Sequence, residues 1–231
     1  MTAKLIILEG PDGCGKSTAA SNLQKLIQSQ YDEQKLDQKA VVLRDPGFTD
    51  IGEELRRMLL DPAKKACPDT IFFGFLAARA ELLAYANRQL VEYGHTVIMD
   101  RLWPSTLAYQ GYGMGISEDI ILSTARYLIG KYVPLHIRIH YCFLTASRAL
   151  RQGRLRAAAG DRGKDRFESK PPEFFDLIDL GYERATHHVD LTMHGVTMHR
   201  LDVTCLTQDQ VVDHIMHGLP DYWSTGLRIK P

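Results

Sequence analysis

The stretch Gly10-Pro-Asp-Gly-Cys-Gly-Lys-Ser17 carries the most specific chemistry of the sequence. It fits the pattern G-x-x-x-x-G-K-[ST], with an apolar strand pattern before it and a helical pattern after it. Glycines let the backbone turn tightly, so that successive N–H groups and the positive end of the following helix bind phosphate oxygens. Lys16 would reach the β- and γ-phosphates, and the Ser17 hydroxyl would ligate Mg²⁺. The stretch predicts a nucleoside triphosphate site made of Gly10, Gly13, Gly15, Lys16, Ser17 and Thr18.

This loop by itself does not name a reaction, because switches, motors and small-molecule kinases all use it. The sequence has no Asn-Lys-x-Asp segment that would select guanine. The third strand pattern ends in Asp100-Arg101, without the Asp-Glu ending of many ATP-driven motors. We therefore favour an enzyme that phosphorylates a small molecule. A regulatory nucleotide-binding protein and a motor subunit remain as alternatives.

Arginines near the ends of predicted strands indicate a second anion site. Arg44 closes the second strand, and Arg101 directly follows the third. The carboxyl ends of parallel strands meet at one edge of a sheet, beside the phosphate loop, so both guanidinium groups could hold a second phosphate there. Phe75 and Arg79 lie four residues apart in a helical pattern and share one face. This pair could stack on an aromatic base and hydrogen-bond its carbonyl group.

A parallel sheet is needed to bring these side chains together, and the sequence predicts one. Apolar runs that read as strands alternate with helical patterns, which indicates right-handed βαβ units and an α/β fold with helices on both faces of the sheet. The predicted strands are 4–9, 40–44, 95–99, 136–144 and 196–203. The predicted helices are 17–30, 51–60, 69–93, 105–110, 118–129, 146–158, 172–188 and 208–217. No linker divides residues 1–231, so we expect a single domain.

Composition limits the possible partners and compartment. The chain has 28 Lys and Arg against 28 Asp and Glu, so no general attraction to nucleic acid or to an anionic membrane is expected. The longest apolar run, residues 71–78, is far shorter than the roughly 20 residues of a membrane span. The N-terminal segment leads into Gly-Pro-Asp-Gly instead of a cleavage site, and the four cysteines form no CxxC pair. We expect a cytoplasmic protein without signal peptide, disulfides or a zinc site.

The motifs in their order along the chain resemble the thymidylate kinase family. After the second strand come Arg44-Asp-Pro-Gly-Phe-Thr49, and the long helix carries Phe75-Leu-Ala-Ala-Arg79. The third strand leads into Asp100-Arg-Leu-Trp-Pro-Ser-Thr-Leu-Ala-Tyr-Gln-Gly111, the most specific stretch. The resemblance extends from residue 4 to about residue 217. It implies the P-loop kinase fold with a short lid, and transfer of the γ-phosphoryl group of ATP to dTMP.

The resemblance also implies the roles of individual residues. Arg44 and Arg101 would hold the acceptor phosphate, Phe75 would stack on thymine, and Arg79 would bind the base carbonyl. Other substrate contacts are implied for Asp12, Pro46, Thr106, Tyr109 and Gln110, with Asp12 near the sugar 3′-OH and Pro46 near the C5 substituent. The implied metal is Mg²⁺, with Ser17, Glu9 and Asp100 near it or its waters. A homodimer formed through the long helices is implied as well.

A basic segment resembles the lid of the bacterial-like type within this family. Residue 13 is glycine, so the loop carries no catalytic arginine, and the lid at about residues 151–170 would supply one. We expect catalytic roles for Arg154 and Arg156, together with Lys16, Arg101 and Asp12, and Arg162 is the next candidate. Helical spacing places Arg154 on the same side as Arg151, whereas Arg156 is rotated away.

Two residues depart from the family pattern and bear on the choice of acceptor. Phe48 replaces the second glycine of Pro-Gly-Gly-Thr, in a loop that faces the acceptor, and Trp103 stands where the family commonly has other residues. A kinase for a C5-modified deoxyuridylate or another deoxynucleoside monophosphate therefore remains an alternative.

Overall fold

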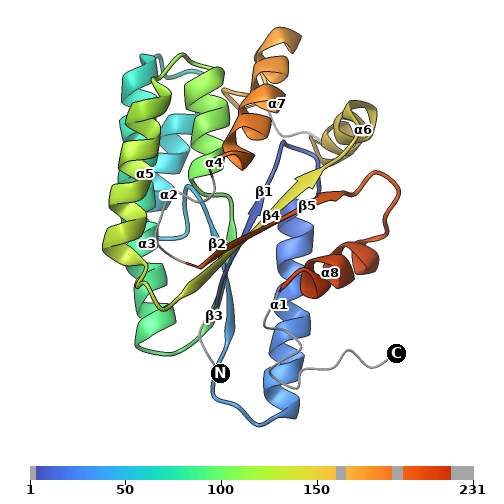
Figure 1. Cartoon of the computed structure of the whole chain (residues 1–231). Helices are drawn as coiled ribbons and strands as arrows, with labels where there is room; N and C mark the ends of the chain where they lie inside the picture. Colours follow the sequence, from blue (N-terminus) through green and yellow to red (C-terminus); the bar gives the residue numbers. More distant parts are fainter. Residues whose placement is uncertain (1–3, 160–164, 189–194, 220–231) are drawn as a thin grey trace.

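The computed structural model describes residues 4–159, 165–188 and 195–219, which fold around a parallel sheet (Figure 1). Its strands have the order β2-β3-β1-β4-β5, and every neighbouring pair is parallel. This confirms the predicted α/β fold with a five-stranded parallel sheet. The strands are β1 (Lys4–Glu9), β2 (Ala40–Arg44), β3 (Thr96–Asp100), β4 (Arg138–Thr145) and β5 (Val196–Asp202).

The helices follow the predicted order with small shifts at their ends. Their bounds are α1 (Lys16–Glu33), α2 (Asp50–Leu60), α3 (Pro68–Val91), α4 (Trp103–Thr106), α5 (Glu118–Tyr132), α6 (Arg148–Ala159), α7 (Pro172–Thr186) and α8 (Gln208–His217). Thr49 caps α2 by accepting a hydrogen bond from the Gly52 N–H, and Thr207 forms a capping box with Gln210 at the start of α8. None of these helices has both the length and the apolar character needed to cross a membrane.

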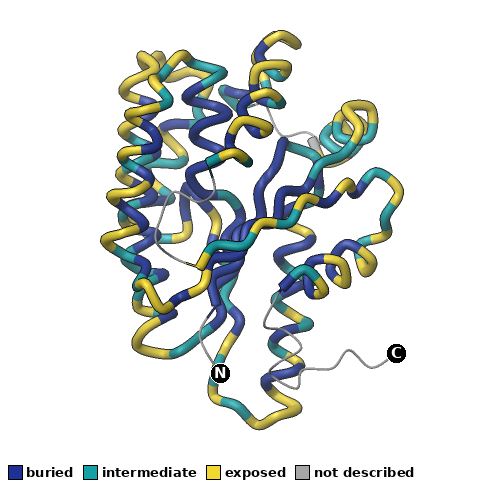
Figure 2. Tube along the Cα trace, in the orientation of Figure 1, coloured by how far each residue is buried: buried dark blue, intermediate teal, exposed yellow. Residues whose placement is uncertain are grey.

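The sheet is covered on both faces because its central strand is apolar on both sides. β1 is buried along its whole length, and Figure 2 shows the inner strands as the most continuously buried part of the trace. Leu5 and Ile7 pack in one core cluster, with side chains of α3 and α5. Ile6 and Leu8 pack in the other, with side chains of α1 and α8. Continuous apolar strands of this kind are typical of buried parallel sheets.

Strand register places the candidate polar residues at one edge of the sheet. Leu8 pairs with Asp100, and Asp100 also pairs with Arg44 on its other side. Glu9 ends β1 at the same level. The phosphate loop, Arg44 and the Asp100–Arg101 pair therefore emerge side by side at the carboxyl end of the strands, where open α/β sheets bind ligands.

The segment after β3 differs from the helix predicted over residues 105–110. Helix α4 begins two residues earlier, at Trp103, and continues as a π-helix, η1 (Leu107–Tyr112). The N–H of Gly113 bonds to the carbonyl of Ala108, the i to i+5 spacing of a π turn. This wider winding presents Thr106, Tyr109 and Gln110 to one cleft, described below.

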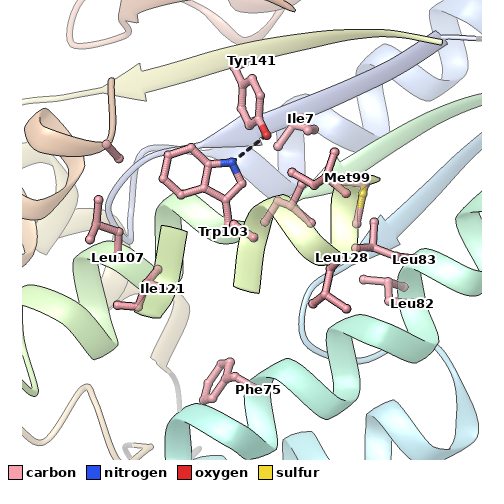
Figure 3. Close-up of a cluster of buried hydrophobic side chains, with 14 of the residues drawn as sticks. Ile7, Phe75, Leu82, Leu83, Met99, Trp103, Leu107, Ile121, Leu128 and Tyr141 are labelled. Carbon is pink, nitrogen blue, oxygen red and sulfur yellow. Dashed lines mark hydrogen bonds between the residues drawn. The ribbon is translucent and has the colours of Figure 1, made fainter. Parts of the chain in front are cut away.

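A buried hydrogen bond joins two side chains of the core beside this segment. Trp103 is 1 % exposed and donates from its indole Nε1 to the Tyr141 hydroxyl at 2.8 Å (Figure 3). Leu107, Ile121 and Leu128 belong to the same apolar cluster. Removing one partner of a hydrogen bond that is surrounded by apolar groups costs free energy, because the other polar group stays buried without a partner.

Removing either partner of this bond should therefore destabilise the fold. We expect Trp103→Phe and Tyr141→Phe to lower the free energy of unfolding by about 1–3 kcal/mol each. In the double variant the two changes share one lost bond, so the loss should be about 1 kcal/mol smaller than the sum. Urea unfolding of the four proteins measures this coupling, and strictly additive losses would contradict it.

Candidate active site

The phosphate loop between β1 and α1 requires its glycines. Gly10, Gly13 and Gly15 have φ values of 132°, 83° and 88°, a region that side chains disfavour. The space is also filled, since a Cβ at Gly10 would lie 2.0 Å from the Leu144 carbonyl oxygen. One at Gly13 would lie 2.6 Å from the Arg151 carbonyl oxygen. The loop thus packs tightly against the end of β4 and against α6.

Helix α1 begins at Lys16 and presents the predicted cation and hydroxyl. Lys16 is 5 % exposed, and its Nζ donates to the Pro11 carbonyl at 2.8 Å. Burial lowers the pKa of this amine. The Ser17 hydroxyl donates to Asp100 Oδ2 at 2.6 Å, across from the end of β3. The other carboxylate oxygen, Asp100 Oδ1, is buried and has no hydrogen-bond partner among the described residues.

A wide, polar cleft lies over this loop, and we call it the phosphate-loop cleft. It contains the predicted Gly13, Gly15, Lys16, Ser17 and Thr18, and it brings Arg44 and Arg154 to the same space. Arg154 of α6 donates to the Gly13 carbonyl at 3.3 Å. The basic helix therefore reaches the loop through one of the two arginines predicted to be catalytic.

A second, more apolar cleft adjoins the first, and we call it the aromatic cleft. Its lining contains every base-contact residue implied by the sequence, namely Pro46, Phe75, Arg79, Thr106, Tyr109 and Gln110. Phe167 closes it from the segment after α6, with its ring centroid 6.1 Å from that of Phe75 and 5.4 Å from that of Tyr109. The pocket is built from α3, η1 and the end of the lid segment.

Arg79 is fixed at the base of the aromatic cleft. Its side chain is 3 % exposed, and its Nε donates to Asp45 Oδ2 at 2.7 Å. Its Nη2 donates to the Thr106 hydroxyl at 2.7 Å and to the Leu102 carbonyl at 3.3 Å. Within the part of the chain that the structure describes, Gln110 Nε2 and Asp45 Oδ1 are buried here without hydrogen-bond partners. Native proteins rarely leave such groups unpaired, so both are suited to a polar ligand.

Arg101 lies where the two clefts meet. It has a φ of 77°, unusual for a residue with a side chain, and its Nη2 forms an ion pair with Asp12 in the phosphate loop. Its guanidinium carbon lies 5.4 Å from the centre of the Tyr109 ring, whose hydroxyl donates to Asp12 at 2.5 Å. Although burial acts in the opposite direction, Arg101 and Lys16 hold the pKa of Asp12 well below its ordinary value.

The clefts share a wall, which is the main geometric finding. Asp12, Asp45, Arg56, Arg101 and Asp165 line both of them. Two ligands occupying the two clefts would therefore meet at Arg101 and Arg56, with the loop lysine on one side. Such an arrangement places cationic groups around two anions that react with each other.

Several sequence-predicted residues lie outside the clefts. Glu9 is fully buried, and its two carboxylate oxygens accept from the Leu102 N–H at 2.6 Å and the Ser105 hydroxyl at 2.7 Å. Burial raises the pKa of Glu9 to about 7. Glu9 is absent from the described lining of both clefts, and each of its carboxylate oxygens is already bonded to a neighbouring group of the protein. Gly10 supports the turn without lining the phosphate-loop cleft.

The lid arginines differ in their placement. Arg156 is exposed, its Nη2 lies 3.5 Å from Gln152 Oε1, and it reaches neither cleft, because its position on α6 is rotated away from Arg154. The structure therefore does not bring Arg156 to the site. Arg162 lies outside the described residues.

The sequence analysis missed several residues of the site, among them Arg56, Asp165 and Phe167. Arg56 lies about two turns after the start of α2. Counting helical turns from the Thr49 cap could have shown that its side chain is on the face of α2 toward the site. Asp165 and Phe167 belong to the segment predicted as the lid, where the neighbouring Arg166 donates to the Leu59 and Asp61 carbonyls at 2.7 and 3.0 Å. This anchoring to the end of α2 fixes its neighbours, and no local pattern reveals it.

Comparison with known proteins agrees with this geometry. The family model described as thymidylate kinase matches residues 8–200. The chain is 37% identical over 184 residues to a thymidylate kinase of Pseudomonas fluorescens, covering 79% of this chain and 81% of that protein. It is 35% identical over 181 residues to one of Psychrobacter, covering 78% and 82%.

A solved structure shows the same fold. The crystal structure of thymidylate kinase from Ehrlichia chaffeensis superposes with a TM-score of 0.68 at 21% identity, covering 95% of this chain and all of that one. The matching family model spans most of the chain, including the phosphate loop and the motifs of the aromatic cleft. This protein belongs to the thymidylate kinase family of nucleoside monophosphate kinases.

Proposed function

We propose that the protein transfers the γ-phosphoryl group of ATP to dTMP, giving dTDP and ADP, and that the described clefts hold the two nucleotides. The shared wall of the two clefts is the observation that carries the assignment. A regulatory switch needs one nucleotide site, whereas a monophosphate kinase needs two that meet. The membership in the family agrees with this reading.

In the phosphate-loop cleft, the triphosphate of ATP would bind the loop N–H groups and the start of α1. Lys16 would exchange its present bond to the Pro11 carbonyl for the β- and γ-phosphates. Because Lys16 is buried in the free protein, its charge is poorly solvated and gains strongly from an anionic ligand.

In the aromatic cleft, thymine would lie against Phe75, with Arg79 and the unpaired Gln110 Nε2 as donors to the base carbonyl groups. Thr106 would support Arg79 and contact the base edge, and Pro46 would lie near the C5 methyl group. The hydroxyl of Tyr109 already donates to Asp12, which supports a position of both side chains beside the sugar. There Tyr109 would disfavour a ribose 2′-OH, and Asp12 would contact the 3′-OH.

The acceptor phosphate would lie at the shared wall, held by Arg101, Arg44 and Arg56. Arg56 is a proposal from the structure, because it lines both clefts. Arg44 is half exposed and paired with Glu53 at 2.9 Å, so it could turn toward an incoming phosphate at little cost. No general base is required, since a phosphate monoester is mostly dianionic at neutral pH. Positioning and charge neutralisation carry the reaction.

Mg²⁺ fits the donors that the chain supplies. The Ser17 hydroxyl and the Asp100 carboxylate are adjacent, and Asp100 Oδ1 is buried without a partner. Mg²⁺ prefers oxygen ligands and commonly uses one or two protein groups together with phosphates. When bound, it would neutralise negative charge on the β- and γ-phosphates. Glu9 is not part of this proposal, because both of its oxygens are already bonded elsewhere.

The alternative acceptors lose their main support in the structure. Phe48 lines neither cleft; its ring is 43% exposed and lies 5.1 Å from the ring of Tyr85. Trp103 is a core residue bonded to Tyr141. Neither residue belongs to the described lining of the aromatic cleft, which supports dTMP as the acceptor.

Assembly and location complete the proposal. Exposed apolar side chains on α2 and α3, among them Ile51, Met58 and Phe73, support a homodimer formed through these helices. All four cysteines are free thiols, which supports a reducing compartment, the cytoplasm.

A screen of acceptors tests the proposed reaction. ADP release should depend on Mg²⁺ and on an acceptor, with the highest kcat/KM for dTMP among dTMP, dUMP, 5-hydroxymethyl-dUMP, dCMP and dGMP. Slow ATP hydrolysis that no monophosphate accelerates would contradict the assignment. Preference for another acceptor would retain the reaction class and refute dTMP as the substrate.

The two lid arginines provide a matched pair of variants. Arg154→Ala should lower kcat by about 10³-fold or more, because a cation at the transferring phosphoryl group contributes roughly 10³–10⁵ in rate. Arg156→Ala removes the same charge two residues away on an exposed part of α6 and should change kcat less than about threefold. Steady-state kinetics at saturating ATP and dTMP distinguish the two. Equal losses would contradict the assignment of Arg154.

A further inference from the structure

A tyrosine from α7 reaches the junction of the clefts. Tyr182 is 5% exposed, and its hydroxyl contacts Arg101 Nη1 and lies 2.8 Å from the Ser105 hydroxyl. It was not singled out by any sequence motif. It contacts a different guanidinium nitrogen of Arg101 from the one that pairs with Asp12.

Arg101 is held by different groups at its two ends. Nη2 pairs with Asp12, while Nη1 donates to the Gly10 carbonyl at 3.1 Å, to the Ser105 hydroxyl at 2.9 Å and to Tyr182. Asp12 lies in the wall of both clefts and would meet the substrates. Of the three partners of Nη1, Gly10 and Tyr182 are absent from the described linings of both clefts, so their contacts can persist while the guanidinium group binds phosphate.

The hydroxyl protons in this network have only one consistent arrangement when Glu9 is ionised. Ser105 has one proton, and it donates to Glu9 Oε2 at 2.7 Å. The Ser105 oxygen can then only accept, so Tyr182 donates its proton to Ser105. The Tyr182 oxygen is left as an acceptor, and Arg101 Nη1 is its donor. The donated protons therefore all point in the same direction, from Arg101 through Tyr182 and Ser105 to the buried Glu9 carboxylate.

Close packing fixes Tyr182 in this place. The neighbouring Gly181 brings α7 so near to η1 that a Cβ would lie 2.6 Å from the Ala108 Cα. The ring of Tyr182 packs edge-on to that of Tyr109, with centroids 6.3 Å apart and an interplanar angle of 86°. A hydroxyl attached to so constrained a ring is a rigid acceptor.

Helix α7 also contacts the helix that carries the lid arginine. Asp179 of α7 pairs with Arg151 at 2.7 Å and with Arg148 at 3.1 Å, both on α6. Arg154 lies one turn further along α6 and reaches Gly13. Helix α7 therefore contacts Arg101 through Tyr182, and through Asp179 it contacts α6, the helix that carries Arg154.

We propose that Tyr182 is a positioning residue that orients the Arg101 guanidinium toward the acceptor phosphate. The expected effect on kinetics rests on the proposed function. The expected effect on the orientation of the Arg101 guanidinium group does not depend on it. Tyr182 itself touches no substrate, because its hydroxyl is occupied by Arg101 and Ser105.

Tyr182→Phe removes the hydroxyl and keeps the packed ring, and Tyr141→Phe is the matched control. Tyr141 is also a buried tyrosine whose hydroxyl accepts one hydrogen bond, but its donor is the core residue Trp103. We expect Tyr182→Phe to lower kcat/KM for dTMP about tenfold, a typical effect of losing a hydrogen bond to a charged group. KM for ATP should remain within twofold. Tyr141→Phe should retain wild-type kinetics and lose only stability.

Two further readouts separate positioning from a structural role. In an Arg101→Lys background, Tyr182→Phe should cost less than twofold, because the group that it orients is gone. Side-chain NMR of isotopically labelled arginine should show faster exchange of the Arg101 guanidinium protons with water in Tyr182→Phe than in Tyr141→Phe.

Unchanged kinetics in Tyr182→Phe, full additivity with Arg101→Lys, or equal guanidinium exchange in both tyrosine variants would overturn the inference. A wild-type protein that phosphorylates none of the acceptors would instead refute the proposed function. In that case the NMR comparison still tests the orientation of Arg101, because it needs no turnover.

Discussion

The contact on which the site depends is the ion pair between Arg101 and Asp12. It joins the end of β3 to the phosphate loop after β1, and it lies in the wall shared by the two clefts. Arg101 stands in a backbone conformation unfavourable for a side chain, and surrounding contacts must stabilise it. Those contacts come from Gly10, Ser105 and Tyr182. The cationic centre is thus built before a substrate arrives, which is how preorganised sites stabilise transferring charge.

The sheet explains why these groups meet. Parallel pairing aligns the carboxyl ends of β1, β2 and β3. The phosphate loop after β1, Arg44 at the end of β2 and Arg101 after β3 therefore lie at one edge of the sheet. The two apolar faces of β1 hold α1 on one side and α3 on the other, which brings Lys16 and Arg79 to that edge from opposite layers. Helices α6 and α7 then cover the edge, and Figure 1 shows them above the ends of β1 and β4.

Most of the fold and much of the site could be predicted from the sequence, because their signals are local. The glycine spacing defines the loop, and the Phe75–Arg79 spacing defines one helix face. Glu9 shows what local patterns do not predict. Its place at the end of β1 follows from the strand pattern, but its carboxylate is bonded to the N–H of Leu102, which is far away in the sequence. Phe167 and Tyr182 were missed for the same reason, since only tertiary packing brings Phe167 to the aromatic cleft and the Tyr182 hydroxyl to Arg101. Helical phase did separate Arg154 from Arg156, although both had been assigned catalytic roles.

The central claim is that two nucleotides bind end to end across Arg101. The most direct measurement is calorimetric titration with a pentaphosphate that links adenosine and thymidine through their 5′ oxygens. One molecule should bind per chain, prior saturation with either a non-hydrolysable ATP analogue or dTMP should compete with it, and Arg101→Lys should weaken it. Binding that only one of the two nucleotides competes with, or that the Arg101 substitution leaves unchanged, would show that the two nucleotides do not meet at Arg101.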